Sequence, residues 1–220
     1  MPEQSPVTSR PGKPARLPVR LCGEPAPQPG HVCALVTGDD KYDMLAEYFS
    51  DAIHAGDQLI NIVEAGMMDD HVRALEEREV PVRRAMSTNR LILNDAESTY
   101  LRDGTVDVDG VFEMVRETLE RADEDGSCVR TCGDMSWVSR TPDALKAVMT
   151  YEARINSLLP GNHCTLLCLY DLTRIPAYLV ADVLATHEYA IMNGRLRRNP
   201  YFVAPDEYLA MLSKRPERLS

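Results

Sequence analysis

The sequence predicts an α/β fold, in which helices flank a mainly parallel β-sheet. Short apolar segments alternate along the chain with longer segments whose apolar residues recur every three or four positions. The first of the short segments, HVCALVT, is almost uninterrupted by polar residues, as in a strand that is covered on both faces of a parallel sheet. Strands that alternate with helices form βαβ units, and the right-handedness of their crossovers leaves few topologies.

The apolar segments are the predicted strands. The first reads HVCALVT, and the others have a similar composition. They cover residues 31–37, 57–65, 90–97, 127–138 and 163–172. A last segment, residues 188–199, contains the pair Asn193-Gly194, which suits a tight hairpin turn.

The periodic segments between the strands are the predicted helices. Residues 41–56 place Leu45 and Phe49 on one face, and Gly56 ends the helix. Thr141 and Pro142 offer an N-cap followed by proline at the first helical position. The remaining helices are predicted at residues 69–79, 108–126, 142–161 and 176–185.

Two regions follow from this organisation. Residues 1–30 are rich in proline and arginine and offer little that could enter a core, so we expect a flexible or extended tail that folding does not require. Residues 31–220 are expected to form a single domain, because 220 residues suffice for one good-sized core and not for two.

Charge and composition exclude several classes of partner. The net charge of −10 argues against nucleic acid and anionic membranes, which require a basic surface. No apolar run reaches the roughly 20 residues of a membrane span, and the first residues lack the apolar core of a secretory signal. We therefore expect a cytoplasmic protein with reduced cysteines.

Polar side chains gather where the predicted strands end. Parallel sheets bind ligands at this edge, so a binding pocket is expected there. The alternative is that these residues are polar only because loops are solvated. The rim includes Asp134, Trp137, Tyr170 and Asp171, and an enzyme using a divalent cation would draw on Asp39, Asp95 and Asp134.

The first strand-to-helix turn lacks the features of a phosphate-binding loop. Its sequence, TGDDKYDM, has one glycine and places Asp39 and Asp40 where phosphates would lie. Glycine-rich loops bind phosphate through backbone amides, a lysine and a hydroxyl. We therefore expect no tight binding of ATP.

Arg130 is a charge within a predicted buried strand. A guanidinium there requires an anionic partner, either in the protein or in a ligand. Glu152 is the leading candidate because it interrupts the apolar stripe of the helix at 142–161, and Asp134 is the next. A structural ion pair is the alternative to a ligand contact.

The cysteines and histidines raise the question of a metal. Cys128 and Cys132, like Cys164 and Cys168, lie four residues apart in strands, which separates them by about 13 Å, so neither pair chelates one ion. We expect no metal and no cofactor, and we interpret the cysteines as small buried hydrophobic residues. The alternative is a metal- or redox-responsive regulator whose site also uses Cys33 and is assembled across neighbouring strands. His31 and His187 flank strands, and we favour hydrogen-bonding core residues over ligands for both.

Several motifs together carry a resemblance to a known family. They are HVCALVT, KYDMLAEYFSDAIHAGDQLINIV, RTCGDMSW, TYEARIN, CLYD, THEYAIMNG and NPYF, in this order. The chain from about His31 to Leu209 resembles the MEDS domain, a sensory domain of methanogen and methylotroph regulators that include the dichloromethane dehalogenase repressor. The opening also resembles a KaiC/RecA-type ATPase whose phosphate loop is gone, because Phe49, Gly56 and Asp57 loosely follow that group's pattern.

The resemblance implies a RecA-like three-layer sandwich and a non-catalytic sensor of small hydrocarbon derivatives. Such a chain would act in signal transduction or transcriptional regulation through a protein partner, without direct contact to nucleic acid, and could form a homo-oligomer. Family-like positions include Tyr151 and Asn199. The residues nominated for ligand binding are His31, Arg130, Asp134, Trp137, Glu152, Tyr170, Asp171, His187 and Tyr201.

Overall fold

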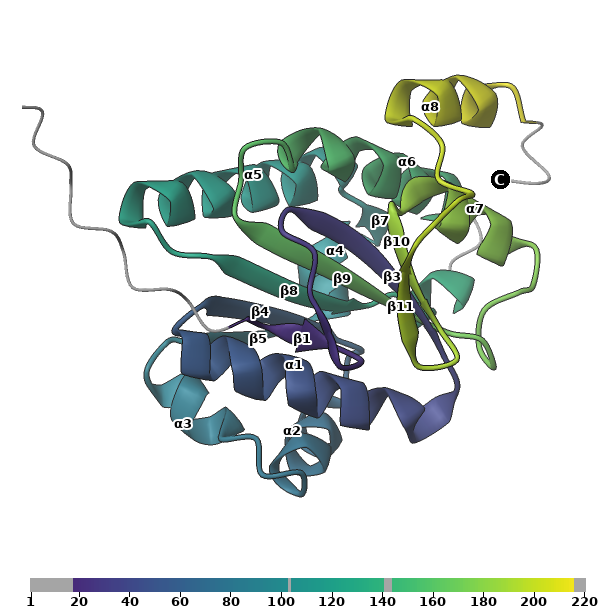
Figure 1. The fold of residues 1–220 in the computed structure, drawn as a ribbon. Helices are drawn as coiled ribbons and strands as arrows, with labels where there is room; N and C mark the ends of the chain where they lie inside the picture. Colours follow the sequence, from purple (N-terminus) through teal and green to yellow (C-terminus); the bar gives the residue numbers. More distant parts are fainter. Residues whose placement is uncertain (1–17, 103, 141–143, 216–220) are drawn as a thin grey trace, which may run out of the picture.

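The protein contains a seven-stranded sheet with helices on both faces (Figure 1). The computed structural model describes residues 18–102, 104–140 and 144–215. In spatial order the strands are β11 (Arg195–Arg198), β10 (Tyr189–Met192), β3 (Gly30–Val36), β9 (Cys164–Asp171), β8 (Val129–Asp134), β4 (Gln58–Val63) and β5 (Leu91–Asp95). All neighbouring pairs are parallel except β10 and β11, so the predicted fold class is confirmed.

Helices form the two outer layers. One face is covered by α1 (Lys41–Ala55), α2 (Met68–Glu76) and α3 (Val82–Ser87) (Figure 1). The other is covered by α4 (Ala96–Tyr100), α5 (Val108–Asp125), α6 (Leu145–Ile155) and α7 (Leu179–Thr186), with α8 (Pro205–Ser213) against α6 and α7. Short 3₁₀ segments follow β3, β8 and α6 at Gly38–Asp40, Ser136–Arg140 and Asn156–Leu158. None of the helices in the described ranges is both long and apolar enough to cross a membrane.

The sheet separates two hydrophobic cores. Successive side chains of a strand point to opposite faces. In β3, Val32 and Ala34 pack in the core under α1, whereas Cys33 packs in the core under α6. The same alternation decides which polar side chains can meet, because those on opposite faces are separated by the backbone of the sheet.

Turn chemistry agrees with the sequence at both glycine signals. Gly56 ends α1 with φ of 74°, a left-handed conformation that glycine adopts readily. Asn193 and Gly194 have φ of 50° and 65°, as a two-residue hairpin turn requires, and they join β10 to β11. The predicted hairpin is therefore confirmed.

The predicted tail is wrong over residues 18–30. The strands β1 (Arg20–Leu21) and β2 (Glu24–Pro25) form a small hairpin beside α1. Val19 and Leu21 are buried in the core under α1, and Arg20 binds Asp51 of that helix with an Nε–Oδ2 distance of 2.8 Å. Buried apolar side chains and this ion pair order a proline-rich segment that has no helix or strand period. Residues 1–17 lie outside the described residues.

Other short elements were not predicted. They are α3, α4 and the strand pair β6 (Leu101–Arg102) and β7 (Thr105–Val106). Elements of two to six residues are too short to show a helical or strand period. The predicted N-cap at Thr141 lies outside the described residues.

Candidate functional site

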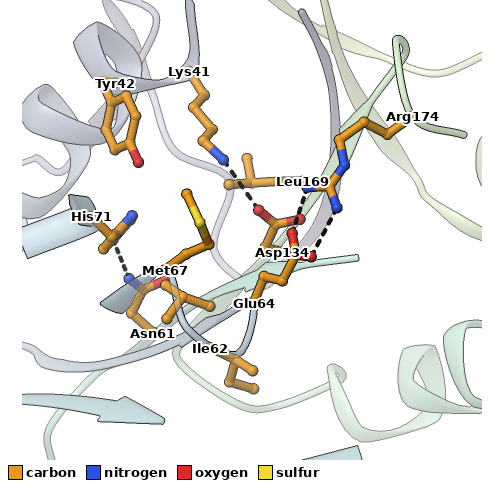
Figure 2. A pocket seen from close by; sticks show the side chains of 11 residues that line it. Lys41, Tyr42, Asn61, Ile62, Glu64, Met67, His71, Asp134, Leu169 and Arg174 are labelled. Atoms are coloured by element: carbon orange, nitrogen blue, oxygen red, sulfur yellow. Dashed lines mark hydrogen bonds and ion pairs between the residues drawn. The ribbon is translucent and has the colours of Figure 1, made fainter. Parts of the chain in front are cut away.

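The carboxyl ends of the strands form a small polar pocket (Figure 2). Nζ of Lys41 lies 3.1 Å from Oδ2 of Asp134, and Nη2 of Arg174 lies 2.9 Å from Oε1 of Glu64. Burial disfavours the charged forms of Lys41 and Asp134, but the attraction between the two charges outweighs it. The pKa of Lys41 is therefore raised, and the pKa of Asp134 is lowered. These two ion pairs line a space of about 40 Å³ at the ends of β4 and β8. A more open depression lies at the ends of β3, β9 and β10, beside Thr37, Leu172 and Asn193.

A buried histidine completes this pocket. His71 contacts the side-chain amide of Asn61 through Nε2 at 2.6 Å (Figure 2). Burial lowers the pKa of His71 to about 4, and the nearby Lys41 acts in the same direction. The imidazole of His71 is therefore neutral near pH 7. The two cations of the pocket, Lys41 and Arg174, are each paired with a carboxylate.

The acidic triad considered for a divalent cation is not assembled. Asp39 is exposed in the 3₁₀ turn after β3. Asp95 accepts from the backbone amide of Ser98 at 2.8 Å and so caps α4, while Asp134 binds Lys41. Each carboxylate has a separate structural role.

A second, larger cavity lies on the face of the sheet beneath α5. Its volume is about 220 Å³, and most of its lining is aliphatic or aromatic. The lining includes Ile60, Ile62, Ile92, Tyr100, Val111, Met114, Val115, Tyr151 and Leu166, with Asn94 and Thr131 among the polar members. Gly133 forms part of the floor, where a Cβ would come within 2.9 Å of the Tyr100 hydroxyl, so glycine leaves room for that ring.

The inner wall of this cavity includes two members of a buried polar cluster, His31 of β3 and Cys168 of β9. The cluster also contains Glu152 of α6 and His187, which directly follows α7. Nε2 of His31 lies 3.0 Å from Oε2 of Glu152, and Nε2 of His187 lies 3.4 Å from the same oxygen. Sγ of Cys168 is 3.6 Å from both Nε2 of His31 and Oε2 of Glu152.

Neighbouring groups fix the orientation of both imidazoles. The amide nitrogen of Asn156 donates to the carbonyls of Glu152, Ala153 and Thr186, so its oxygen faces Nδ1 of His31 at 3.2 Å. Nδ1 of His187 lies 2.8 Å from the carbonyl of Val183. Each Nδ1 therefore carries a proton and donates it, which directs each Nε2 toward Glu152.

The protonation of the cluster follows from its burial. Burial lowers the pKa of His187 to about 3, and His31 acts in the same direction. Burial and then Glu152 raise the pKa of the Cys168 thiol well above its usual range. The Tyr170 hydroxyl donates to Oε1 of Glu152 at 2.9 Å, which leaves Oε2 to the histidines and the thiol. Imidazole, thiol and carboxylate are the donor types that transition metals bind, and no other group of this kind converges in the part of the chain that the structure describes.

Four of the nine nominated residues, His31, Glu152, Tyr170 and His187, meet in this cluster. Trp137 stacks on Tyr100 at 5.4 Å and so lies directly behind the cavity wall. The others are scattered: Asp134 is in the rim, Asp171 accepts from the amide of Thr173 at 2.9 Å, and Tyr201 is 65% exposed. The residues nominated for ligand binding did not include Cys168, because the cysteines were interpreted as small buried hydrophobic residues and a site assembled across strands was only the alternative.

Arg130 is the clearest correction. It is buried and binds a carboxylate, as predicted, but the partner is Asp57, with Nε 2.9 Å from Oδ2. It also donates to Oγ1 of Thr165, whose hydroxyl donates to the carbonyl of Pro27 at 2.7 Å. Glu152 was wrong because Arg130 points to the α1 face of the sheet, whereas α6 covers the other face.

The strand order and the helices on both faces define a three-layer α/β sandwich, and a largely apolar cavity lies on one face of its sheet. Residues 30–188 match the family model of the MEthanogen/methylotroph, DcmR Sensory domain, and the chain belongs to this MEDS family. Comparison with curated proteins finds no similar sequence.

Solved structures confirm the fold. The KaiC-like protein PH0186 from Pyrococcus horikoshii OT3 is similar with a TM-score of 0.55 and 12% identity, over 80% of this chain and 79% of that one. The flagellar accessory protein FlaH from Methanocaldococcus jannaschii is similar with a TM-score of 0.52 and 9% identity, over 83% and 84% of the two chains. At these identities the likeness concerns the fold alone.

Proposed function

We propose that this chain is a non-catalytic sensory domain that binds a small hydrocarbon derivative in the cavity beneath α5. Membership of the MEDS family supports a sensory role. The observation that carries the proposal is the cavity itself, a space of about 220 Å³ whose lining is mostly apolar.

The size and lining of the cavity suit a molecule of few heavy atoms. A cavity of about 150 Å³ already admits benzene, and native cavities of this size are uncommon because each lost contact destabilises the fold. The aliphatic lining selects an apolar body, while Asn94 and Thr131 offer hydrogen bonds to a single polar group. This combination favours a substituted hydrocarbon over a sugar, an amino acid or a nucleotide.

The position of the cavity suggests how binding is transmitted. Helix α5 forms one wall, and its outer face carries Glu113, Arg116 and Glu120 in exposed ion pairs. A ligand that changes the seating of α5 also changes the surface that a protein partner meets. We propose signalling through such a partner, in the cytoplasm, without direct contact to nucleic acid.

The absence of catalysis is part of the proposal. The rim carboxylates Asp134 and Glu64 are engaged by Lys41 and Arg174, so neither is poised as a general base. A ligand that is returned unchanged after prolonged incubation supports this part of the proposal, and conversion of the ligand contradicts it.

Trp137 provides the binding test, because it is the single tryptophan and stacks on Tyr100 in the cavity wall. We expect dichloromethane, chlorobenzene or benzene to change its fluorescence saturably. Val115→Phe fills the cavity from α5 and is expected to weaken binding at least about tenfold, whereas Glu117→Phe on the exposed face of that helix leaves it unchanged. Equal binding by both variants, or no saturable change with any compound, contradicts the proposal.

A further inference from the structure

We propose that His31, Glu152, Cys168 and His187 together bind one divalent transition-metal ion, with zinc the ion that best suits the donor set. The inference goes beyond the sensory function, because four protein side chains would hold the ion whether or not the cavity is occupied. Two imidazoles, a thiolate and a carboxylate are all established zinc ligands.

The distances fit a tetrahedral site. Zinc bonds of about 2.0–2.3 Å imply donor–donor separations of about 3.3–3.8 Å in a tetrahedron. The separations around Oε2 of Glu152 are 3.0 Å to His31, 3.4 Å to His187 and 3.6 Å to Cys168. The distance from Cys168 to His31 is also 3.6 Å, and all four donor atoms lie within 4.8 Å of one another. Closing the widest separations, up to 4.8 Å, to those of a zinc shell requires the side chains to shift by roughly 1 Å.

The surroundings resemble those of established metal sites. Metal-binding histidines usually donate their second nitrogen to a carbonyl or amide oxygen, which fixes the ring and raises its basicity. His31 makes this contact with Asn156, and His187 makes it with the carbonyl of Val183. The Tyr170 hydroxyl likewise holds the second oxygen of Glu152.

An unmatched atom points independently to a ligand in the cluster. Nε2 of His187 is fully buried and has no hydrogen-bond partner, although it faces Oε2 of Glu152. A buried polar atom without a partner lowers stability by about 1–3 kcal/mol. A cluster that served only the stability of the fold would not be expected to leave Nε2 of His187 in this state. A metal ion placed between Nε2 of His187 and Oε2 of Glu152 would accept a lone pair from each of these atoms.

Charge also balances when an ion enters. Without metal, one proton must lie between Nε2 of His31 and Oε2 of Glu152, because two lone pairs cannot face each other at 3.0 Å, and Cys168 carries its own thiol proton. A divalent cation replaces these two protons, leaving two neutral imidazoles, one carboxylate and one thiolate around a charge of +2. The buried cluster is neutral before and after, which avoids the large cost of an uncompensated buried charge.

The test uses the full, untagged chain, stripped of metal with a chelator and titrated with Co²⁺ and Zn²⁺ in the absence of any organic compound. We expect one ion per chain, a tetrahedral Co²⁺ spectrum with a thiolate-to-cobalt band, and displacement of Co²⁺ by Zn²⁺. Calorimetry of Zn²⁺ binding in two buffers of different ionisation enthalpy should show release of about two protons per ion.

Variants assign the ligands. Cys168→Ser should abolish the thiolate band, while Cys164→Ser, a buried cysteine of the same strand, should retain it. His187→Gln should weaken Zn²⁺ binding at least about 100-fold, since even the loss of an outer-sphere partner costs 10–100-fold. Circular dichroism checks that each variant folds.

Several results overturn the proposal. They are a wild-type chain that takes up no stoichiometric Co²⁺, a spectrum without thiolate character, or equal loss of the band in Cys164→Ser and Cys168→Ser. The wild-type spectrum decides the matter even if a variant fails to fold. Val115→Phe should bind metal like the wild type, so failure of the cavity proposal is distinguishable from failure of this one.

Discussion

Arg130 and Glu152 are buried charges on opposite faces of the sheet, where Arg130 binds Asp57 and Glu152 lies beside His31 and His187. Arg130 and Glu152 each stand out as a charge among apolar neighbours, which is why both were expected to be paired. The pairing itself depends on which face of the sheet a strand residue occupies and on which strand lies beside it. Neither property is encoded by local spacing, so two correct inferences were joined into one wrong ion pair.

The buried cluster shows the same limit. Its members come from residues 31, 152, 168 and 187, and no motif links them. The signal that could have found the cluster was the number of polar side chains on otherwise apolar elements, because each of them needs a partner in the core. Cys168 did not give even this signal, because a free cysteine is commonly buried in an apolar core and needs no polar partner there.

At the scale of residues, the Arg130–Asp57 pair gives a direct test. Arg130→Met and Asp57→Asn should each lower the free energy of unfolding by about 3–5 kcal/mol, because each strands the remaining buried charge. The double variant should lose clearly less than the sum. Urea denaturation of the three variants measures the coupling.

The exposed pair of Arg198 and Glu188 serves as the control for that cycle. Arg198 is 79% exposed in its side chain, so Arg198→Met should change stability by less than about 1 kcal/mol. Full additivity of the Arg130 and Asp57 losses would contradict the assigned pairing.

Elements were predictable to the extent that they are long and periodic. The 18 residues of α5 repeat an apolar position over several turns, and the eight residues of β9 form a continuous apolar run. The two-residue strands β1 and β2 offer no period at all. Their order comes from contacts with α1, which no local pattern of the proline-rich segment reveals.

A test at the scale of elements concerns this hairpin. Leu21 is fully buried against α1, so Leu21→Ala should lower the free energy of unfolding by about 2–5 kcal/mol. Glu24→Ala, in the exposed strand of the same hairpin, should change it by less than about 0.5 kcal/mol. If the Leu21→Ala chain is as stable as the wild type, the hairpin does not contribute to stability and the segment is a dispensable tail.

For the molecule as a whole, the fold was predictable and the place of the site was not. The order of strands and helices defines a RecA-like sheet, whose general rule places ligands at the carboxyl ends of the strands. Here the pairs Lys41–Asp134 and Glu64–Arg174 occupy the part of that edge at β4 and β8, an open depression lies at the ends of β3, β9 and β10, and the largely apolar cavity lies on the face under α5. Whether a cavity remains between a helix and a sheet depends on the volumes of side chains from several elements. The pattern of apolar and polar residues along the sequence does not contain this information.

The rim of the sheet leads to a prediction about nucleotides. Mg-ATP should show no micromolar binding by calorimetry, because Asp39 and Asp40 follow β3 where phosphates would lie, and the nearby Lys41 and Arg174 are already paired with carboxylates. A micromolar dissociation constant would show that these ion pairs open and that the edge of the sheet is still a nucleotide site.

The last strand of the sheet bears on how copies of the chain meet. Strand β11 pairs with β10 on one side and forms an edge of the sheet on the other. Three of its four residues are arginines, at positions 195, 197 and 198. Adding the same strand of a second copy would bring arginines of like charge side by side, a device by which natural sheets resist growth from chain to chain. Pairing of β11 with the β11 strand of a second copy is therefore disfavoured, and this border of the sheet should stay closed to fibre-like stacking.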